Sequence, residues 1–253
     1  MTTRHWLPLA CTLIAAPGLA PAQATVKPDG QYRYLFGAGG SYASGNNDAK
    51  SLNINGDGVR ATDTTKWTFG GKALWSRSEG RTTTENAELG TQYDSDVTPV
   101  WFGFGKGDIL RDKLANISSR TSVFGGAGRH VIKRDDLTFD VSAGLGYTQD
   151  RYVEPAIVED ESRQNYGRVE VLLAEESTHK FTPTTSLHQK LSFYPALSSG
   201  GGYRGVFDSN LAVAMTKVLS LTVGLNYRYD SDPGVGLKRG DTLVVTGISM
   251  KLD

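Results

Sequence analysis

The sequence predicts an all-β fold, a single antiparallel transmembrane β-barrel of about twelve strands. The first observation behind this prediction is the alternation of residues 219–230. Every odd position from Leu219 to Tyr229 is apolar or aromatic, and every even position is polar or glycine. Strands of soluble proteins typically have about five or six residues. A strand that crosses a bilayer needs about nine to eleven, with one face in lipid and the other in a polar lumen.

The second observation is that the same alternation recurs along the chain. The predicted strands, in chain order, are residues 32–42, 52–57, 66–76, 87–94, 99–107, 116–130, 137–148, 168–173, 187–193, 207–215, 219–230 and 244–252. Residues 137–148 show the pattern as clearly as residues 219–230, whereas residues 99–107 and 116–130 show it most weakly. An even number of strands is expected for a bacterial barrel made from one chain.

Each of the clearer strands has an apolar stripe. In chain order, these stripes contain Tyr32, Tyr34 and Phe36; Leu52 and Ile54; Trp67, Phe69 and Trp75; Leu89 and Tyr93; Leu137, Phe139 and Val141; Val169, Val171 and Leu173; Leu187, Leu191 and Phe193; Phe207, Leu211 and Val213; Leu219, Leu221 and Val223; and Val244, Ile248, Met250 and Leu252. Aromatic residues at the ends of such stripes are typical of the girdles at membrane interfaces.

The third observation is that the connections alternate in length. Short links are expected at residues 61–64, 95–98, 133–136, 177–182 and 217–218, and longer links rich in glycine and charge at residues 44–50, 78–84, 108–115, 153–164, 196–204 and 231–240. Short periplasmic turns and longer external loops are the usual asymmetry of outer-membrane barrels. Both ends of the barrel domain are therefore expected in the periplasm.

The N-terminus predicts export. Residues 1–24 have the layout of a signal peptide: Arg4 precedes an apolar run, and Ala22-Gln23-Ala24 is a small-x-small cleavage site. We therefore expect residues 25–253 to form the barrel domain, located in the cell outer membrane. Cys11 is the only cysteine and lies within the expected signal peptide, so the mature chain is expected to form no disulfide.

The composition of the chain limits the classes of partner that we expect it to bind. The 27 Lys and Arg residues balance the 27 Asp and Glu residues, which argues against nucleic acid as a partner. Glycine makes up 30 of 253 residues, well above the usual share of about 7%. Small residues suit the close strand approach and crowded lumen of a narrow barrel. The expected partners are outer-membrane lipid or lipopolysaccharide, together with small solutes or ions.

Charged residues occupy the polar stripes of the predicted strands. The candidates for facing the lumen are Arg33, Asp57, Lys66, Lys72, Glu88, Asp94, Arg120, Asp140, Arg168, Glu170, Lys190, Asp208, Arg228 and Asp230. Their signs nearly balance, and long side chains fill much of the interior of a barrel of this size. We expect opposed charges to pair across the lumen and to leave a narrow water path at most.

No catalytic, cofactor or metal site is predicted. A hydrolase of the lipase type needs a nucleophile, a histidine base and an orienting carboxylate or amide within hydrogen-bond reach. His130, His179 and His188 follow no nucleophile motif, so polar wall or lumen positions explain them better. An outer-membrane lipid or peptide hydrolase that uses His130 or His188 is a minor alternative.

Three other patterns have ordinary explanations. The acidic residues of loop 153–164 lack the spacing of an EF-hand, and charge runs are usually solvated. Residues 103–107 look like a phosphate loop but precede no helix, so a strand with small residues toward the lumen is the better explanation. The aromatic residues Trp67, Trp75, Trp101, Tyr32 and Tyr42 are expected to anchor the barrel at the membrane interface.

Several short motifs resemble a known family. They are Ser44-Gly45-Asn46, Gly125-Gly126-Ala127-Gly128, Ala143-Gly144-Leu145-Gly146-Tyr147, and the C-terminal hairpin from Leu219 through Tyr229-Asp230-Ser231-Asp232-Pro233 to Asp241. In order and spacing the chain is similar, over residues 32–252, to a bacterial outer-membrane family of unknown function called salt-induced outer membrane protein. The resemblance implies a barrel in the outer membrane and a connection to osmotic or envelope stress. It implies no activity, ligand or catalytic residue.

Two non-enzymatic functions stay open. One is a narrow, porin-like channel for small solutes or ions, and the other is a plugged structural or stress-response barrel that acts through its external loops. The main alternative for the fold is a secreted, water-soluble β-sandwich, which also alternates but has shorter strands without aromatic ends.

Overall fold

The computed structural model describes residues 26–43, 49–158, 161–197, 202–233 and 238–252, and these residues form twelve strands and no helix. The strands are β1 (Tyr32–Ala43), β2 (Ala49–Ala61), β3 (Thr65–Ser78), β4 (Arg81–Asp96), β5 (Trp101–Asp112), β6 (Ile117–Lys133), β7 (Leu137–Val158), β8 (Glu161–Lys180), β9 (Thr185–Pro195), β10 (Tyr203–Ala214), β11 (Leu219–Asp230) and β12 (Gly240–Leu252). Within these ranges, no helical segment meets the length and hydropathy of a membrane span.

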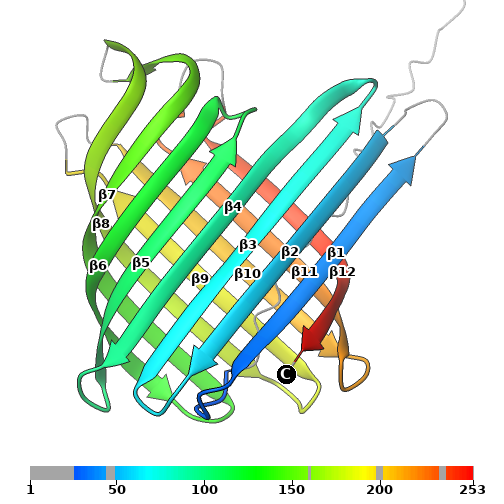
Figure 1. The fold of residues 1–253 in the computed structure, drawn as a ribbon, viewed down its shortest axis with the longest axis vertical. Helices are drawn as coiled ribbons and strands as arrows, with labels where there is room; N and C mark the ends of the chain where they lie inside the picture. Colours follow the sequence, from blue (N-terminus) through cyan, green and yellow to red (C-terminus); the bar gives the residue numbers. More distant parts are fainter. Residues whose placement is uncertain (1–25, 44–48, 159–160, 198–201, 234–237, 253) are drawn as a thin grey trace, which may run out of the picture.

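Neighbouring strands pair antiparallel all the way round, and β12 returns to pair with β1, so the sheet is a closed barrel. The predicted fold is thereby confirmed. Figure 1 shows the strands tilted steeply in the wall, with the start of β1 and the C-terminus at one end, which we call the lower end. The closing seam is short: the register of β1 with β12 runs from Tyr34 opposite Leu252 to Ala38 opposite Ile248.

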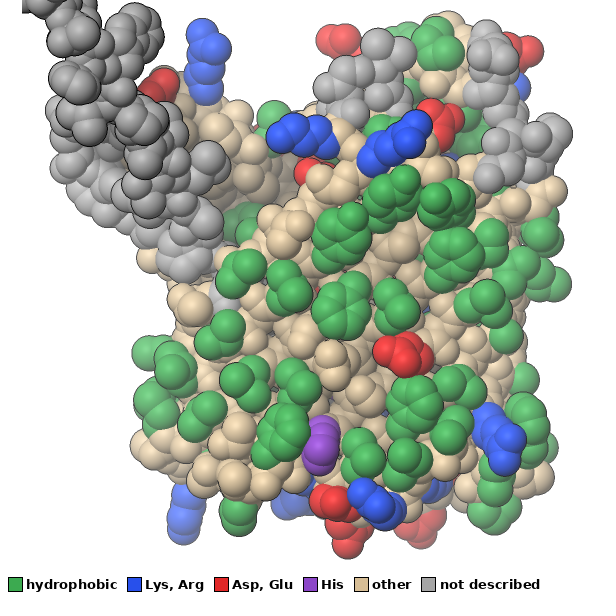
Figure 2. Space-filling view, turned by 180° about the vertical axis from the view of Figure 1, so that it is seen from behind, with side chains coloured by type: hydrophobic (Ala, Val, Ile, Leu, Met, Phe, Trp, Pro, Cys, Tyr) green, Lys and Arg blue, Asp and Glu red, His purple; other side chains and the backbone are tan. Residues whose placement is uncertain are grey.

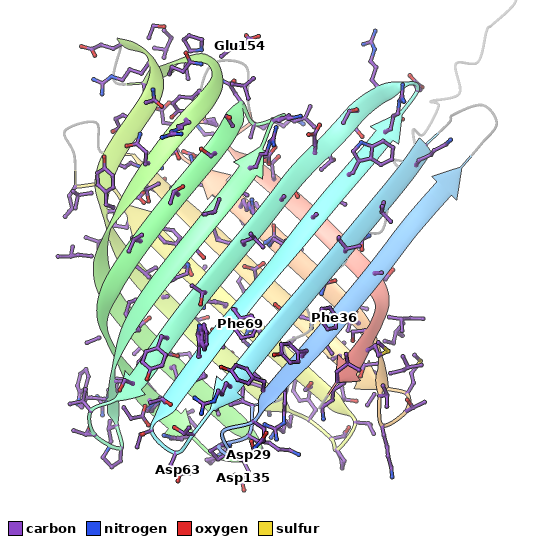
Figure 3. All side chains as sticks on the ribbon, viewed as in Figure 1. Asp29, Phe36, Asp63, Phe69, Asp135 and Glu154 are labelled. Carbon is purple, nitrogen blue, oxygen red and sulfur yellow. The ribbon has the colours of Figure 1, made fainter. Side chains whose placement is uncertain are left out.

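The outer wall is apolar around the barrel. Several large apolar side chains on it are more than half exposed, namely Leu52, Ile54, Leu89, Val123, Leu145 and Ile248. Figure 2 shows hydrophobic side chains scattered over the middle of one face, while charged side chains gather toward the two ends. In Figure 3, Phe36 and Phe69 lie on the wall, Asp29, Asp63 and Asp135 at the lower end, and Glu154 at the upper end.

Aromatic side chains border this apolar belt. At the lower end, Tyr32 and Trp67 are 43% and 40% exposed and their rings lie 6.3 Å apart. Trp101 lies at the same end and Trp75 toward the upper end, both exposed. The side chain of Tyr42 lies outside the described part of the chain. These positions fit the interface anchors expected from the sequence.

The lower connections are short turns, as predicted, but three of the upper connections differ from the prediction. The loops predicted at residues 44–50, 196–204 and 231–240 lie partly outside the described residues. Residues 78–84 do not form a loop, because Glu79 and Gly80 make a two-residue turn with φ values of 49° and 77°. That backbone suits the twist of a hairpin. The loop predicted at residues 108–115 is shorter than expected, because β5 continues to Asp112. The loop predicted at residues 153–164 is an extension of the β7–β8 hairpin, which rises above the rest of the barrel (Figure 1).

One predicted strand has the opposite phase. Residues 103, 105 and 107 were expected toward the lumen, but these glycines face outward, and Phe102, Phe104 and Lys106 face inward. The inward phase places Lys106 2.8 Å from Asp108. It also buries the two phenylalanines in an apolar cluster with Phe124, Leu172 and Tyr194. A shift of the strand by one residue would turn all these side chains outward, and both the ion pair and the burial of the two phenylalanines would be lost.

Glycines on the next strands make room for the inward aromatic rings. A Cβ atom added to Gly128 would lie 2.2 Å from the ring of Phe102, and one added to Gly146 would lie 2.2 Å from the ring of Phe124. Aromatic rings that cover glycines on a neighbouring strand stabilise sheets. The lumen is therefore partly filled from the wall by rings that pack on bare backbone.

Other glycines allow the backbones of neighbouring strands to approach closely, and Gly126 and Gly105 give a matched test of this role. A Cβ atom at Gly126 would lie 2.2 Å from the carbonyl oxygen of Ala143, whereas one at Gly105 would meet nothing within 4 Å. We expect Gly126→Ala to lower the free energy of unfolding by about 1–3 kcal/mol, because backbone cannot move aside cheaply. Gly105→Ala should be neutral or stabilising by about 0.5–1 kcal/mol.

Urea unfolding of the protein refolded in detergent micelles measures both effects. Equal unfolding midpoints for the two variants would contradict the close approach of the Ala143 backbone to Gly126.

Candidate functional site

The pairing register puts the predicted lumen residues on the side of the sheet that faces away from the apolar belt. For example, Lys66 pairs with Asp94 and Lys72 with Glu88, while their sequence neighbours Trp67 and Leu89 face outward. Most of these residues then fall into two networks of charge, one toward the upper end of β6–β8 and one in the middle of the barrel.

The upper network joins three arginines and two carboxylates. Asp150 accepts hydrogen bonds from Arg120 at 2.6 and 2.8 Å and from Arg168 at 2.8 Å. Glu170 accepts one from Arg168 at 2.9 Å and two from Arg204 at 2.7 and 3.1 Å. The two carboxylates are 0% and 1% exposed. Charges removed from water this far are retained only when they are paired and hydrogen-bonded, as they are here.

Further contacts complete the upper network. Thr148 donates to Glu170 at 2.5 Å, and Ser122 and Thr148 lie 2.9 Å apart. The guanidinium of Arg204 lies over the ring of Tyr194 at 4.9 Å, which ties the network to the apolar cluster below it. Asp230 lies 3.9 Å from Arg120, at the edge of the network.

The central network crosses the lumen. Lys66 on β3 lies 3.2 Å from Asp94 and 4.0 Å from Glu176 on β8. Lys190 on β9 lies 3.0 Å from Glu176 and donates to Gln92 on β4 at 3.4 Å. The strands β3 and β4 lie nearly opposite β8 and β9 in the ring, so these contacts bridge the barrel.

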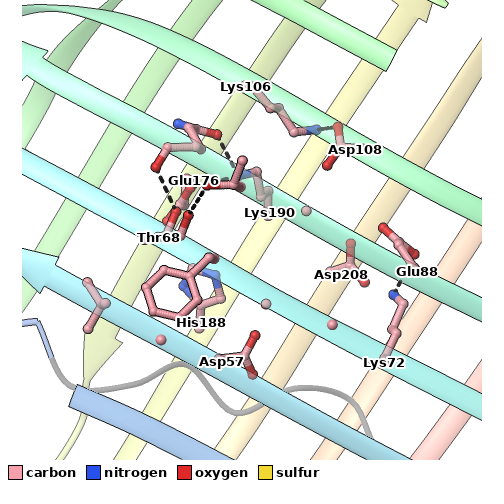
Figure 4. A pocket seen from close by; sticks show the side chains of 18 of the residues that line it. Asp57, Thr68, Lys72, Glu88, Lys106, Asp108, Glu176, His188, Lys190 and Asp208 are labelled. Atoms are coloured by element: carbon pink, nitrogen blue, oxygen red, sulfur yellow. Dashed lines mark hydrogen bonds and ion pairs between the residues drawn. The ribbon is translucent and has the colours of Figure 1, made fainter. Parts of the chain in front are cut away.

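Two more contacts bridge the lumen near the central network. Glu88 on β4 pairs with Lys72 at 3.3 Å and also accepts a hydrogen bond from Arg228 on β11, across the barrel. Lys106 on β5 donates to the hydroxyl of Tyr194 on β9 at 3.0 Å. Figure 4 shows Lys72 and Glu88 turned toward each other, with Lys106 beside Asp108.

A cavity of about 230 Å³ lies among these bridges. Its charged lining consists of Lys72, Lys106 and Lys190 together with Asp57, Glu88, Asp108, Glu176 and Asp208. Asp208 accepts a hydrogen bond from Asn226 at 2.5 Å, whereas the Oδ2 atom of Asp57 is buried without a hydrogen-bond partner. The cavity holds several waters or one small solute, because a water occupies about 30 Å³ of liquid.

His130 does not form a hydrolytic site. Its Nδ1 atom lies 2.8 Å from Asp140 and its Nε2 atom 3.1 Å from Asp96, so both ring nitrogens contact carboxylates. The ring of Phe102 covers it at 4.8 Å. A catalytic base needs one nitrogen directed at a nucleophile. His130 instead links β4, β6 and β7 near the lower end.

The other histidines also have ordinary contacts. His188 faces the cavity, and its Nδ1 atom lies 3.1 Å from the hydroxyl of Thr178. His179 packs on Phe181 at 4.3 Å, next to the lower turn. Across the described ranges, no group of three or more His, Cys, Asp or Glu side chains is arranged to hold a metal ion.

Arg33 acts at the lower end rather than in the networks. It forms an ion pair with Asp29, in the segment that precedes β1. The hydrogen bond from Arg33 lowers the pKa of Asp29 to about 2, so the carboxylate stays ionised in mildly acidic solution. This ion pair links the segment before β1 to the inward face of β1.

Sequence reasoning missed several members of the networks. Asp150 and Glu176 are in phase with the predicted inward residues of their strands, but the predicted strands ended at residues 148 and 173. Extending the alternation would have found both. Lys106 was missed because the phase of residues 99–107 was wrong. Asp108 was missed because residues 108–115 were predicted as a loop, and Arg204 because the predicted strand began at residue 207.

Solved structures with a similar arrangement of strands include outer-membrane proteins. A structure of the NanC porin is 10% identical, with a TM-score of 0.48, and the match covers 87% of this chain and 97% of that one. The translocator domain of the autotransporter NalP from Neisseria meningitidis is 12% identical, with a TM-score of 0.48 and 88% coverage of both chains. A bacterial polysaccharide outer membrane secretin is 9% identical with a TM-score of 0.43, covering 87% of this chain and 97% of that one.

Sequence comparison with curated proteins finds no match. A family model, by contrast, matches residues 36–251, which is nearly the whole barrel from β1 to β12. The chain therefore belongs to the family described as "Protein of unknown function, DUF481".

Proposed function

We propose that the protein spans the bacterial outer membrane with its apolar belt in contact with lipid. The observation that supports this is the exposure of large apolar residues all round the wall, as at Leu89 (65%) and Val123 (62%). Soluble proteins rarely expose apolar patches of more than a few hundred Å². In a bilayer, the closed ladder pairs the backbone groups that hydrocarbon cannot hydrogen-bond, and the aromatic borders lie at the membrane interfaces.

Membrane insertion is tested by fractionation. We expect the protein in the outer-membrane fraction, extracted by detergent, and we expect its gel mobility to change on heating because a closed barrel resists SDS until it unfolds. Recovery of a compact, folded chain from the soluble periplasm without detergent would contradict the proposal. It would instead favour a water-soluble fold with the same strand pattern.

We further propose that the barrel is a narrow channel for small solutes. The contacts of Lys66 with Glu176, Lys190 with Gln92, and Arg228 with Glu88 reach across the lumen and divide it. The cavity between them has room for a small solute and is lined by both signs of charge. Such a lumen supports slow passage of small molecules and excludes large ones.

Conductance in planar bilayers tests the channel. We expect unitary conductance well below the nanosiemens scale of open porins, and we expect Arg228→Ser to raise it at least two-fold because a bridging side chain is removed. The matched control is Arg111→Ser, since Arg111 lies on the outward face of β5 and is exposed. A nanosiemens conductance in the wild type, or equal effects of the two substitutions, would contradict the narrow channel.

A plugged barrel that acts through its upper loops is the second candidate. The apolar cluster around Phe104 and the upper network favour it, because together they fill the lumen beside β5–β8. The complete absence of conductance in the wild type and in Arg228→Ser would favour this candidate. The connection to osmotic or envelope stress stays a prediction from the family resemblance.

A further inference from the structure

We propose that the solute path runs along one side of the lumen, the amide sector, and that it takes small uncharged solutes rich in hydroxyl groups. We define the amide sector as the inward faces of Ser51, Asn53, Asn55, Gly37, Gly39, Ser249, Gly247, Thr222, Asn226 and Asn210, on β2, β1, β12, β11 and β10. This inference rests on the proposed channel function and names its path and its class of solute.

The opposite side of the lumen is closed by large side chains. Phe102, Phe104, Phe124, Leu172 and Tyr194 pack there as one cluster, on the wall from β5 to β9. The upper network lies against this cluster, with its two carboxylates fully buried. A solute that passed on this side would have to separate buried ion pairs, and breaking such pairs is strongly unfavourable.

The amide sector, by contrast, is lined mostly by small and neutral groups. Between Arg33 at the lower end and Arg228 toward the upper end, glycine, serine, threonine and asparagine make up most of its lining. The aromatic rings and arginines that fill the opposite wall are therefore missing from this stretch, and its charged side chains are Asp57, Asp208 and Lys251. At the lower end, Leu35 and Val59 pack together and narrow the path, which sets an upper limit on solute size.

Unpartnered polar atoms in the amide sector point to a ligand. Asn55, Asn210 and Ser249 are 7%, 5% and 2% exposed, and Asn55 Oδ1, Asn210 Oδ1 and Ser249 Oγ have no hydrogen-bond partner among the described residues. Buried polar side-chain atoms are nearly always hydrogen-bonded, so each exception needs an explanation. Asn210 also lines the central cavity. Water or a passing solute on this side would supply the missing partners.

The chemistry of the lining selects the solute. Asparagine offers two N–H donors and a carbonyl acceptor, and serine and threonine hydroxyls both donate and accept. A solute with several hydroxyl groups can exchange its hydrogen bonds with water for bonds with these groups at little cost. A charged solute would lose hydration beside lining groups that are mostly neutral, and Asp208 already accepts a hydrogen bond from Asn226. The amide sector therefore favours neutral polyols and sugars over charged molecules of the same size.

Introduced cysteines test the path, because Cys11 is the only natural cysteine and a Cys11→Ser background removes it. Ser249→Cys and Asn55→Cys probe the amide sector. Ser142→Cys is the matched control: it is the same substitution on the inward face of β7, in the charged half of the lumen. Each refolded variant is treated with 2-hydroxyethyl methanethiosulfonate, a small neutral thiol reagent that carries a hydroxyl group. Labelling is counted by mass spectrometry, and conductance is recorded before and after.

We expect the reagent to label Ser249→Cys and Asn55→Cys and to reduce their conductance at least two-fold, while Ser142→Cys keeps its conductance. Blockage of Ser142→Cys alone, or of all three variants equally, would overturn the path while leaving the channel itself intact. Failure of the reagent to label or block the two amide-sector variants would overturn it as well. Absence of conductance in the wild type would contradict both the proposed channel function and the proposed solute path.

Liposome swelling tests the class of solute. Glucose, gluconate and glucosamine are close in size but neutral, negative and positive. We expect glucose to enter proteoliposomes several-fold faster than either charged analogue. Faster entry of gluconate or glucosamine would show that the charged half of the lumen selects the solute, and would overturn the assignment.

Discussion

The structure depends above all on the pairing of backbone polar groups around a closed ring of strands. Hydrocarbon offers these groups no partner, so a sheet in a bilayer has to supply every hydrogen bond itself. Consecutive antiparallel pairing and the return of β12 to β1 satisfy this demand. Once the ladder is fixed, alternation assigns each side chain to lipid or lumen. Adjacent residues such as Glu88 and Leu89 therefore meet opposite surroundings, one in an ion pair and the other 65% exposed on the wall.

The interior is filled by two kinds of contact that support each other. Rings of Phe102 and Phe124 lie on the bare backbone of Gly128 and Gly146, and Arg204 lies on the ring of Tyr194 while binding Glu170. The glycine motifs at residues 125–128 and 143–147, which carry the family resemblance, thus have a packing role. Gly128 and Gly146 receive aromatic side chains from the neighbouring strand, whereas Gly126 and Gly144 allow close approach of the backbones of β6 and β7. The apolar cluster in turn shields the upper network from water, which strengthens its ion pairs.

The sequence predicted the fold well wherever the alternation was unambiguous. Residues 219–230 coincide with β11 because leucine and tyrosine mark one face throughout. Residues 99–107 were assigned the wrong phase because alternating glycine does not reveal which face is buried, and the contact of Lys106 with Asp108 appears only in the folded strand. The approach of Lys66 to Glu176 was beyond sequence reasoning. Which strands lie opposite each other depends on how the barrel closes, and the residue pattern of a single strand does not contain this information.

The short seam between β1 and β12 has a mechanical consequence. Five positions of β1 are paired with β12, against twelve with β2 on its other edge, in the part of the chain that the structure describes. Fewer hydrogen bonds therefore have to break between β1 and β12 than between β1 and β2 before the barrel opens. The upper part of β1 carries Gly39 and Gly40, which add little side-chain contact to hold it. Thermal or mechanical rupture of the wall should therefore begin at this join and spread outward from it.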